Sequence, residues 1–105
     1  MDKVMQMLSL SKKAGKLISG EALARDAIRY GDACIVILAE DTGKNTAKAI
    51  GDSCTYYEVP YYIYGTKDSL GHAIGKAYCA VCAVCDEGLA NSIENSIKAN
   101  INGGE

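Results

Sequence analysis

Seven consecutive apolar residues, Ala33–Ala39, restrict the fold of this 105-residue chain more than any other feature. The segment is rich in β-branched side chains and does not alternate with polar residues, which predicts a strand buried on both faces. A tyrosine-rich strand is expected at 59–64, and a second continuous apolar strand at 79–85. Strands buried on both faces need helices on each side of their sheet.

Amphipathic helical patterns separate these strands. Asp2, Ser19, Thr66 and Asp86 are predicted to cap four of the helices, and a brief strand is expected at 17–18. Strands that alternate with helices of roughly 10–15 residues predict right-handed crossovers. The pattern therefore predicts an α/β fold in which a largely parallel sheet lies between helical layers.

The length of the chain suits one hydrophobic core and is too short for two. We therefore expect a single domain at 1–101 and a frayed tail at 102–105. Apolar residues make up 49% and charged residues 23%, which excludes an intrinsically disordered chain. No signal-peptide core or membrane-spanning apolar run is present, and the cysteines number five. These features predict a cytoplasmic protein with reduced thiols and no membrane contact, and we expect a monomer.

Three closely spaced cysteines, Cys79, Cys82 and Cys85, resemble a metal or iron–sulfur motif at first sight. On a strand, however, Cys82 faces away from the other two, and Cys79 and Cys85 lie roughly 20 Å apart. One metal ion cannot bind all three, so we interpret them as small buried apolar side chains. We expect no metal and no cofactor. This reasoning requires that the segment is a strand and not a loop.

Candidate catalytic groups are few. His72 is the only histidine, and no second base accompanies it, so we interpret it as an exposed helix residue. We expect the protein not to be an enzyme. Glu40 and Asp41 follow a predicted strand, at the position where α/β sheets bind ligands. The alternative is that these two carboxylates only stabilise the start of a helix.

Charge is unevenly distributed along a chain whose net charge is −2. Residues 1–20 have a net charge of +3, and residues 21–105 have a net charge of −5. An acidic balance of this kind opposes nonspecific nucleic-acid binding through bulk charge. Five basic residues nevertheless precede or lie on the predicted second helix: Lys12, Lys13, Lys16, Arg25 and Arg29.

The start of this second helix is a candidate phosphate site. Leu23, Ala27 and Ile28 are predicted to form its buried face, so that both arginines point outward. Near Gly20 the helix offers unpaired backbone N–H groups and the positive end of its dipole, which suit a phosphate group. These features predict a cationic edge suited to RNA. The alternative is a solvated charged face without a ligand.

Several ordered segments make the sequence similar to a known family. They are Leu10–Glu21, Ala27–Gly31, Ile35–Asp41, Asn45–Thr46, Val59–Pro60 and Leu70–Lys76. In this order they resemble the YlxQ-like branch of the L-seven-Ae (kink-turn RNA-binding) superfamily, a group of small bacterial ribosomal-protein-like proteins. The resemblance covers about residues 4–95. It implies a three-layer α/β/α sandwich with a four-stranded mixed sheet, and RNA binding as the activity.

The resemblance also indicates where RNA would bind. Family members typically use the start of the second helix, the turn after the following strand and the loop before the last strand, which are 20–25, 40–44 and 76–78 here. Combined with the cationic edge, these places give the predicted RNA-binding residues: Lys13, Lys16, Ser19, Gly20, Glu21, Arg25, Arg29, Glu40, Asp41, Lys44, Lys76 and Tyr78.

Some positions depart from the family pattern. Kink-turn binders of the superfamily usually carry an Asn-Glu pair and a lysine on the second helix, and an acidic residue in the turn after the next strand. Those positions are Ala22, Leu23, Asp26 and Gly43 here. The resemblance therefore implies that base-reading groups are missing and that RNA binding is weaker or narrower than in those members.

Two functions of different classes remain open. The first is a non-enzymatic, ribosomal-protein-like module that binds structured RNA and acts with ribosomes or the translation machinery. The alternative is a protein-interaction adaptor on the same fold with weak or lost RNA binding. The acidic balance and the five tyrosines between 56 and 64 favour this alternative, because tyrosine is common in interface hot spots.

Overall fold

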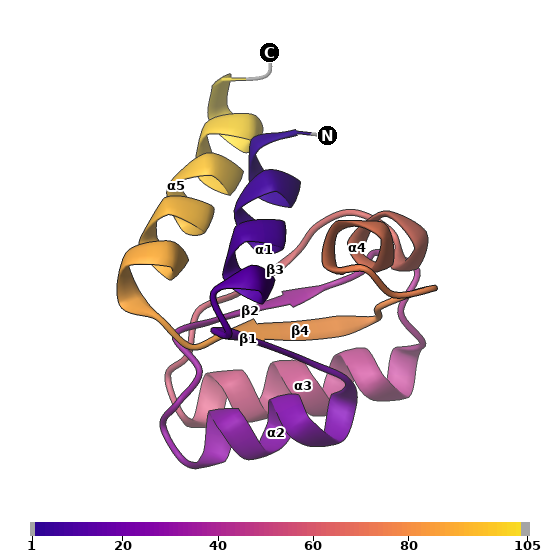
Figure 1. The fold of residues 1–105 in the computed structure, drawn as a ribbon. Helices are drawn as coiled ribbons and strands as arrows, with labels where there is room; N and C mark the ends of the chain where they lie inside the picture. Colours follow the sequence, from indigo (N-terminus) through magenta and orange to yellow (C-terminus); the bar gives the residue numbers. More distant parts are fainter. Residues whose placement is uncertain (1, 104–105) are drawn as a thin grey trace.

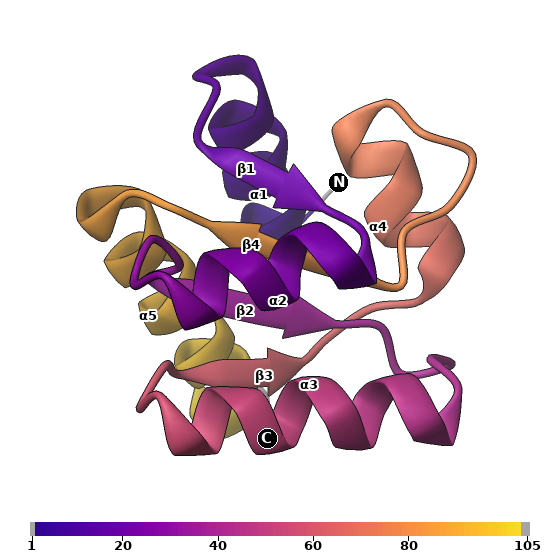
Figure 2. The same ribbon diagram turned by 90° about the horizontal axis from the view of Figure 1, so that it is seen from below.

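A four-stranded sheet lies between two layers of helices in the computed structural model, which describes residues 2–103 (Figure 1). Along the chain the elements are α1 (Lys3–Lys13), β1 (Leu17–Ser19), α2 (Glu21–Arg29), β2 (Ile35–Leu38), α3 (Lys44–Tyr56), β3 (Tyr61–Ile63), α4 (Lys67–Ile74), β4 (Val81–Val84) and α5 (Glu87–Gly103). Helices α1, α4 and α5 cover one face of the sheet, and α2 and α3 cover the other (Figures 1 and 2). The three-layer α/β/α sandwich implied by the family resemblance is confirmed.

The strand order is β1-β4-β2-β3, and the sheet is mixed. Only β2 and β3 are parallel, whereas β4 is antiparallel to both of its neighbours. The largely parallel sheet predicted from the alternation of elements is therefore wrong. The reason is that α4 does not carry the chain to the opposite end of the sheet, as a crossover between parallel strands would. The Cys79 N–H donates to the Lys67 carbonyl at 2.9 Å, so β4 starts at the end of the sheet where α4 also starts.

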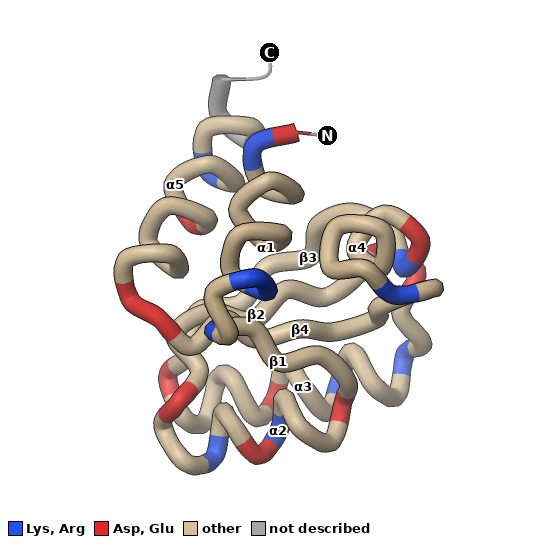
Figure 3. Tube along the Cα trace, in the orientation of Figure 1, with Lys and Arg blue, Asp and Glu red and all other residues tan. Residues whose placement is uncertain are grey.

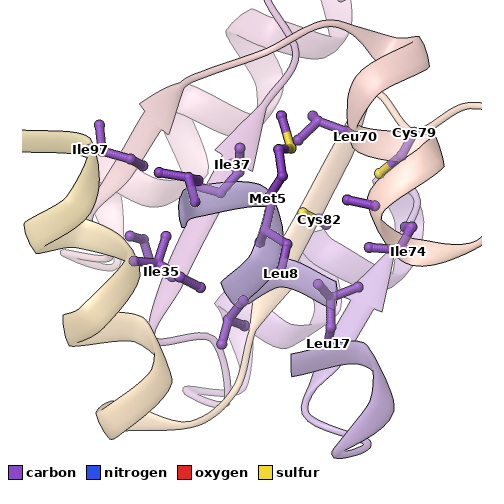
Figure 4. Packing of buried hydrophobic residues seen from close by; sticks show 14 of the residues in the cluster. Met5, Leu8, Leu17, Ile35, Ile37, Leu70, Ile74, Cys79, Cys82 and Ile97 are labelled. Carbon is purple, nitrogen blue, oxygen red and sulfur yellow. The ribbon is translucent and has the colours of Figure 1, made fainter. Parts of the chain in front are cut away.

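The central strands are buried on both faces, as their continuous apolar sequence predicts. Ile35 and Ile37 of β2 pack among α1, α4 and α5 in the core shown in Figure 4. Val36 and Leu38, which alternate with them, pack against α2 and α3. Burying a side chain of this size stabilises the fold by about 1.5–3 kcal/mol.

Three of the four predicted helix caps are confirmed. The side chains of Asp2, Thr66 and Asp86 accept hydrogen bonds from first-turn N–H groups of α1, α4 and α5 at 2.8–3.1 Å. The Ser19 cap is wrong, because Ser19 still belongs to β1, where it pairs with Cys82. The N-cap of α2 is Gly20, whose φ of 104° lies in a region that favours glycine.

The cysteine-rich segment is only partly a strand. Cys79 precedes β4, and its side chain packs in the same core as Cys82, so the prediction that these two face opposite sides is wrong. Cys85 packs on the other side of the sheet. Cys54 lies outside this segment, on α3, and burial raises the pKa of its thiol to about 11. Among the described residues no group of three or more His, Cys, Asp or Glu side chains is placed to hold a metal ion.

The last helix is described as far as Gly103, so it includes the first two residues of the tail expected at 102–105. Residues 104–105 of that expected tail lie outside the described part. Over residues 2–103, none of the helices has the length and apolar character needed to cross a membrane.

Candidate nucleic-acid interface

Three separate chain segments meet at one end of the sheet. The start of α2 is attached to β4, because the Gly20 N–H donates to the Val81 carbonyl at 3.0 Å. The turn after β2 is attached to the residue before β4, because the Thr42 hydroxyl and the Ala39 N–H both donate to the Ala80 carbonyl, at 3.1 and 2.8 Å. The fold thus brings together the helix start, the turn and the loop that the family resemblance indicates.

A cleft of about 460 Å³ opens between these segments. It is lined by Ser19, Gly20, Glu21, Thr46, Lys76, Ala77, Tyr78, Cys79, Ala80 and Val81. Five of these residues were predicted from the sequence as RNA contacts: Ser19, Gly20, Glu21, Lys76 and Tyr78. Basic segments lie at the start of α3 and at both ends of α4, interspersed with acidic ones (Figure 3).

The start of α2 carries no side-chain cap, so its first N–H groups face the cleft side without a partner from their own helix. Glu21 lies in this first turn, where the helix dipole stabilises its negative charge. Its carboxylate accepts a hydrogen bond from the Thr46 hydroxyl at 2.9 Å and lies 4.0 Å from the Arg25 guanidinium. Glu21 therefore joins α2 to α3, and it reduces the positive potential at this helix start.

The loop between α4 and β4 presents Lys76 and Tyr78. Two backbone hydrogen bonds hold this loop to α4, one from Lys76 to the Gly71 carbonyl at 2.8 Å and one from Cys79 to the Lys67 carbonyl at 2.9 Å. Lys76 is exposed, and the Tyr78 side chain is 65% exposed. An exposed ring on a fixed loop is suited to stacking against an unpaired base.

The two carboxylates after β2 have different surroundings. The Asp41 carboxylate accepts a hydrogen bond from the Lys67 N–H at 2.8 Å, so it stabilises the start of α4. It also lines a second hollow together with Tyr78, which lines the cleft as well. Glu40 instead lines a different cavity with Asp2 and other residues near the start of α1. Only Asp41 of this pair lies beside the candidate interface.

Lys44 and Arg25 do not line the cleft themselves but lie close in the chain to residues that do. Lys44 is the exposed first residue of α3, two residues before Thr46. Arg25 is exposed one turn along α2, beside Glu21. His72 is exposed on α4, as predicted, and lines the cavity that contains Glu40 and not the cleft.

Besides Glu40, three more of the predicted contacts do not reach this cleft. The Lys16 carbonyl accepts from the Cys85 N–H at 2.8 Å, which places Lys16 at the end of β4 opposite to the cleft. Lys13 ends α1 near the same place, and Arg29 ends α2. The single cationic edge predicted from the sequence is therefore divided between the two ends of the sheet.

The buried face of α2 also differs from the prediction. Ala24, Ala27 and Ile28 are buried, whereas Leu23 is 59% exposed. The three buried residues share a core cluster with Val36 and Leu38 of β2, whereas Leu23 lies on a neighbouring face of the helix. Both Arg25 and Arg29 are exposed, as predicted.

Sequence reasoning missed Thr46 and Lys67. Thr46 lines the cleft and binds Glu21, and its place in the Asn45–Thr46 segment of the family resemblance was the available signal. Lys67 pairs with Asp41 only through its backbone N–H, and no feature of the sequence indicates that contact.

Known proteins resemble this chain over most of its length. The family model "Ribosomal protein L7Ae/L30e/S12e/Gadd45 family" matches residues 2–94. The RNA-binding protein YlxQ of Bacillus subtilis is 44% identical over 87 residues, which are 83% of this chain and 87% of that protein. The RNA-binding protein YlxQ of Enterococcus faecium is 36% identical over 96 residues, which are 91% of this chain and 92% of that protein.

Two solved structures share the fold. A Bacillus halodurans protein with unknown function superposes with a TM-score of 0.91 at 33% identity, covering 93% of this chain and 99% of its own. The Giardia lamblia 15.5kD RNA binding protein superposes with a TM-score of 0.76 at 19% identity, covering 93% and 88%, which shows a common fold alone. From the family match and the two YlxQ relatives, the chain belongs to the ribosomal protein L7Ae/L30e/S12e/Gadd45 family.

Proposed function

We propose that this protein is a non-enzymatic RNA-binding module that acts in the cytoplasm with ribosomes or the translation machinery. The observation that carries the proposal is the cleft in which the uncapped start of α2 meets Lys76 and the exposed ring of Tyr78. Two relatives that are 44% and 36% identical to this chain over the aligned residues are named RNA-binding proteins, which supports the same activity.

In the proposed mode of binding, phosphate groups and one base make different contacts. Lys44, Lys76 and the first N–H groups of α2 bind phosphate oxygens, because these are the cationic and unpaired donor groups around the cleft. Tyr78 stacks against an unpaired base. Ala22 and Leu23 offer no polar side chain for a base edge, so the surface selects RNA by shape and by unpaired bases.

Binding to purified, fragmented ribosomal RNA tests the proposal. We expect Lys76→Gln and Tyr78→Ala each to weaken binding severalfold to tenfold, because each removes one phosphate or stacking contact. Lys98→Gln and Tyr30→Ala are matched controls, since Lys98 lies on α5 and Tyr30 is a 70% exposed tyrosine at the far end of α2. Absence of RNA binding by the wild-type protein, or equal effects of site and control variants, would contradict the proposal.

A second candidate function, protein docking, is supported by one observation at the edge of the sheet. Within residues 2–103, β3 is an edge strand that pairs with β2 alone, and it exposes 64% of Ile63 and 38% of Tyr61. Exposed apolar edge strands are templates for pairing with another chain. A protein that copurifies with the wild type but not with Ile63→Lys, while RNA binding is unchanged, would identify this surface as a docking site; copurification with both would exclude it.

A further inference from the structure

The turn between α1 and β1 carries three lysines that the cleft does not use. Lys12, Lys13 and Lys16 are all exposed. Throughout residues 2–103, none of them has a carboxylate oxygen within 4.0 Å, unlike Arg25, Lys48 and Lys98. We call these three residues the lysine turn.

The backbone of the lysine turn is fixed by hydrogen bonds. The N–H groups of Ala14, Gly15 and Lys16 donate to the carbonyls of Leu10, Lys12 and Ser11 at 2.9–3.1 Å. Gly15 adopts a φ of 73°, which reverses the chain. The three ammonium groups of the lysine turn therefore project from an ordered surface and not from a mobile tail.

β1 connects the lysine turn directly to the cleft. In Figure 2 the turn lies at the tail of the β1 arrow, and α2 begins beyond its head. The four residue steps from Lys16 to Gly20 span about 13 Å in an extended strand. Because β1 is an edge strand, its outer side is not covered by another strand of the sheet. A polynucleotide chain that leaves the cleft along this edge reaches the lysine turn within a few nucleotides.

Acidic residues lie on the side of the lysine turn that faces α5, and they disfavour an RNA strand there. Burial and the charge of Asp32 raise the pKa of Cys85, and the charge of Lys16 lowers it, so both charged groups lie near that thiol. The segment just before α5 is also acidic (Figure 3). A phosphate backbone is therefore attracted to the β1 side of the lysine turn and repelled from its α5 side.

We propose that the lysine turn is a second phosphate-binding surface, which holds the RNA strand that continues from the cleft along β1. This inference rests on the proposed RNA-binding function and extends its footprint to the opposite end of the sheet. The wild-type protein then contacts RNA at two separate places about one strand length apart.

The first test compares two triple variants with the same net charge, using fragmented ribosomal RNA over a salt series. In the variant Lys12→Gln, Lys13→Gln, Lys16→Gln, we expect at least tenfold weaker binding at low salt. The slope of log K against log salt should also fall by about 2, because up to three phosphate contacts are lost. The control Lys3→Gln, Lys48→Gln, Lys98→Gln, in which Lys48 lies one turn along α3 from Lys44, should bind within about threefold of the wild type.

The second measurement is protection of lysines from acetylation by a succinimidyl ester, which needs no substitution. We expect bound RNA to protect Lys76 in the cleft and Lys12, Lys13 and Lys16, and to leave Lys98 reactive. Protection of Lys76 alone, or equal binding by the two triple variants, would overturn the second surface while keeping the proposed function. Absence of RNA binding by the wild-type protein would overturn both.

Discussion

At the scale of single residues, Gly71 controls the position of the candidate stacking ring. A Cβ atom at this position of α4 would lie 2.5 Å from the Cα of Tyr78 and 2.8 Å from its backbone N and C atoms. Backbone at that distance cannot give way as a flexible side chain does, so the loop that carries Lys76 and Tyr78 must shift.

We therefore expect Gly71→Ala to lower the free energy of unfolding by about 1–3 kcal/mol, as overpacked sites do, and to weaken RNA binding through the displaced Tyr78. Gly88→Ala is the matched control, because Gly88 is also helical and the nearest atom to its added Cβ is a flexible carboxylate oxygen at 3.4 Å. Urea unfolding followed by circular dichroism measures both variants. Equal stability of Gly71→Ala and wild type would show that the close packing has no energetic role.

Tyr64 links the two ends of the chain through its hydroxyl group. The hydroxyl donates to the Asp2 carboxylate at 2.7 Å and accepts from the Asn100 amide at 2.9 Å. Burial and the hydrogen bond to Asp2 raise the pKa of Tyr64 to about 12. Because the folded-state pKa is raised, the neutral phenol stabilises the fold below the unfolded pKa of about 10, and this stabilisation is lost as pH rises from 10 to 12.

Tyr64→Phe should therefore be less stable than wild type by about 1 kcal/mol at pH 7, the usual net value of such a hydrogen bond. The difference between the two proteins should shrink above pH 10, because only the wild type loses the contribution of this phenol. Urea unfolding of both proteins at pH 7, 9 and 11 measures it. A difference that stays constant over this range would exclude the role of the Asp2 contact.

At the scale of elements, the outer side of α2 departs from the pattern of kink-turn binders. Ala22, Leu23 and Asp26 are exposed on its outer side, away from the buried Ala24 and Ala27. They occupy the positions where the resemblance places base-reading and phosphate-binding side chains in kink-turn binders. The helix thus keeps the position of an RNA-binding helix but carries an alanine, a leucine and an acidic residue there.

The triple variant Ala22→Asn, Leu23→Glu, Asp26→Lys should bind a kink-turn RNA at least tenfold more tightly than wild type, because base-edge contacts contribute about 1–3 kcal/mol each. The variant Asp26→Lys alone separates the charge effect from base reading. A straight duplex of the same length should gain less from the triple variant than from Asp26→Lys, because Leu23→Glu adds a negative charge. If the triple variant does not exceed Asp26→Lys on the kink-turn RNA, the outer side of α2 does not read bases.

The same elements show what could be predicted from the sequence. β2 was predictable because both faces of Ile35–Leu38 are apolar. The direction of β4 was not, because the sequence does not show that α4 returns the chain to the end from which it left β3. The exposure of Leu23 was also hidden, since a helical pattern containing both Leu23 and Ala24 fits two neighbouring faces.

The site was predictable only in part, for a similar reason. Residues around Gly20 and Tyr78 follow from the family resemblance, and the cleft contains them. Lys16 is close to Gly20 in sequence, but the extended strand β1 separates them by its whole length. Closeness in sequence indicates closeness in space within a turn or a helix, but not across a strand.

At the scale of the whole molecule, we expect the placement of charges, and not the net charge of −2, to govern RNA binding. The protein measures 31 × 29 × 26 Å, whereas charges are screened over about 8 Å at physiological salt. Each part of the surface therefore acts on RNA mainly through its own charges. Acidic residues matter if they lie near the cleft or the lysine turn, and little if they lie beyond a few screening lengths.

Two conservative variants, each of which removes one negative charge, test whether the placement of charges or the total charge governs RNA binding. Asp26 lies six residues along α2 from Gly20, about 9 Å away, whereas Glu58 follows the far end of α3, about 18 Å or more from Lys44. At physiological salt we expect Asp26→Asn to strengthen binding of fragmented ribosomal RNA two- to threefold and Glu58→Gln to leave it unchanged. At 0.01 M salt the screening length is about 30 Å and exceeds both distances, so both variants should strengthen binding. If Glu58→Gln matches Asp26→Asn at physiological salt, total charge and not its placement governs the interaction.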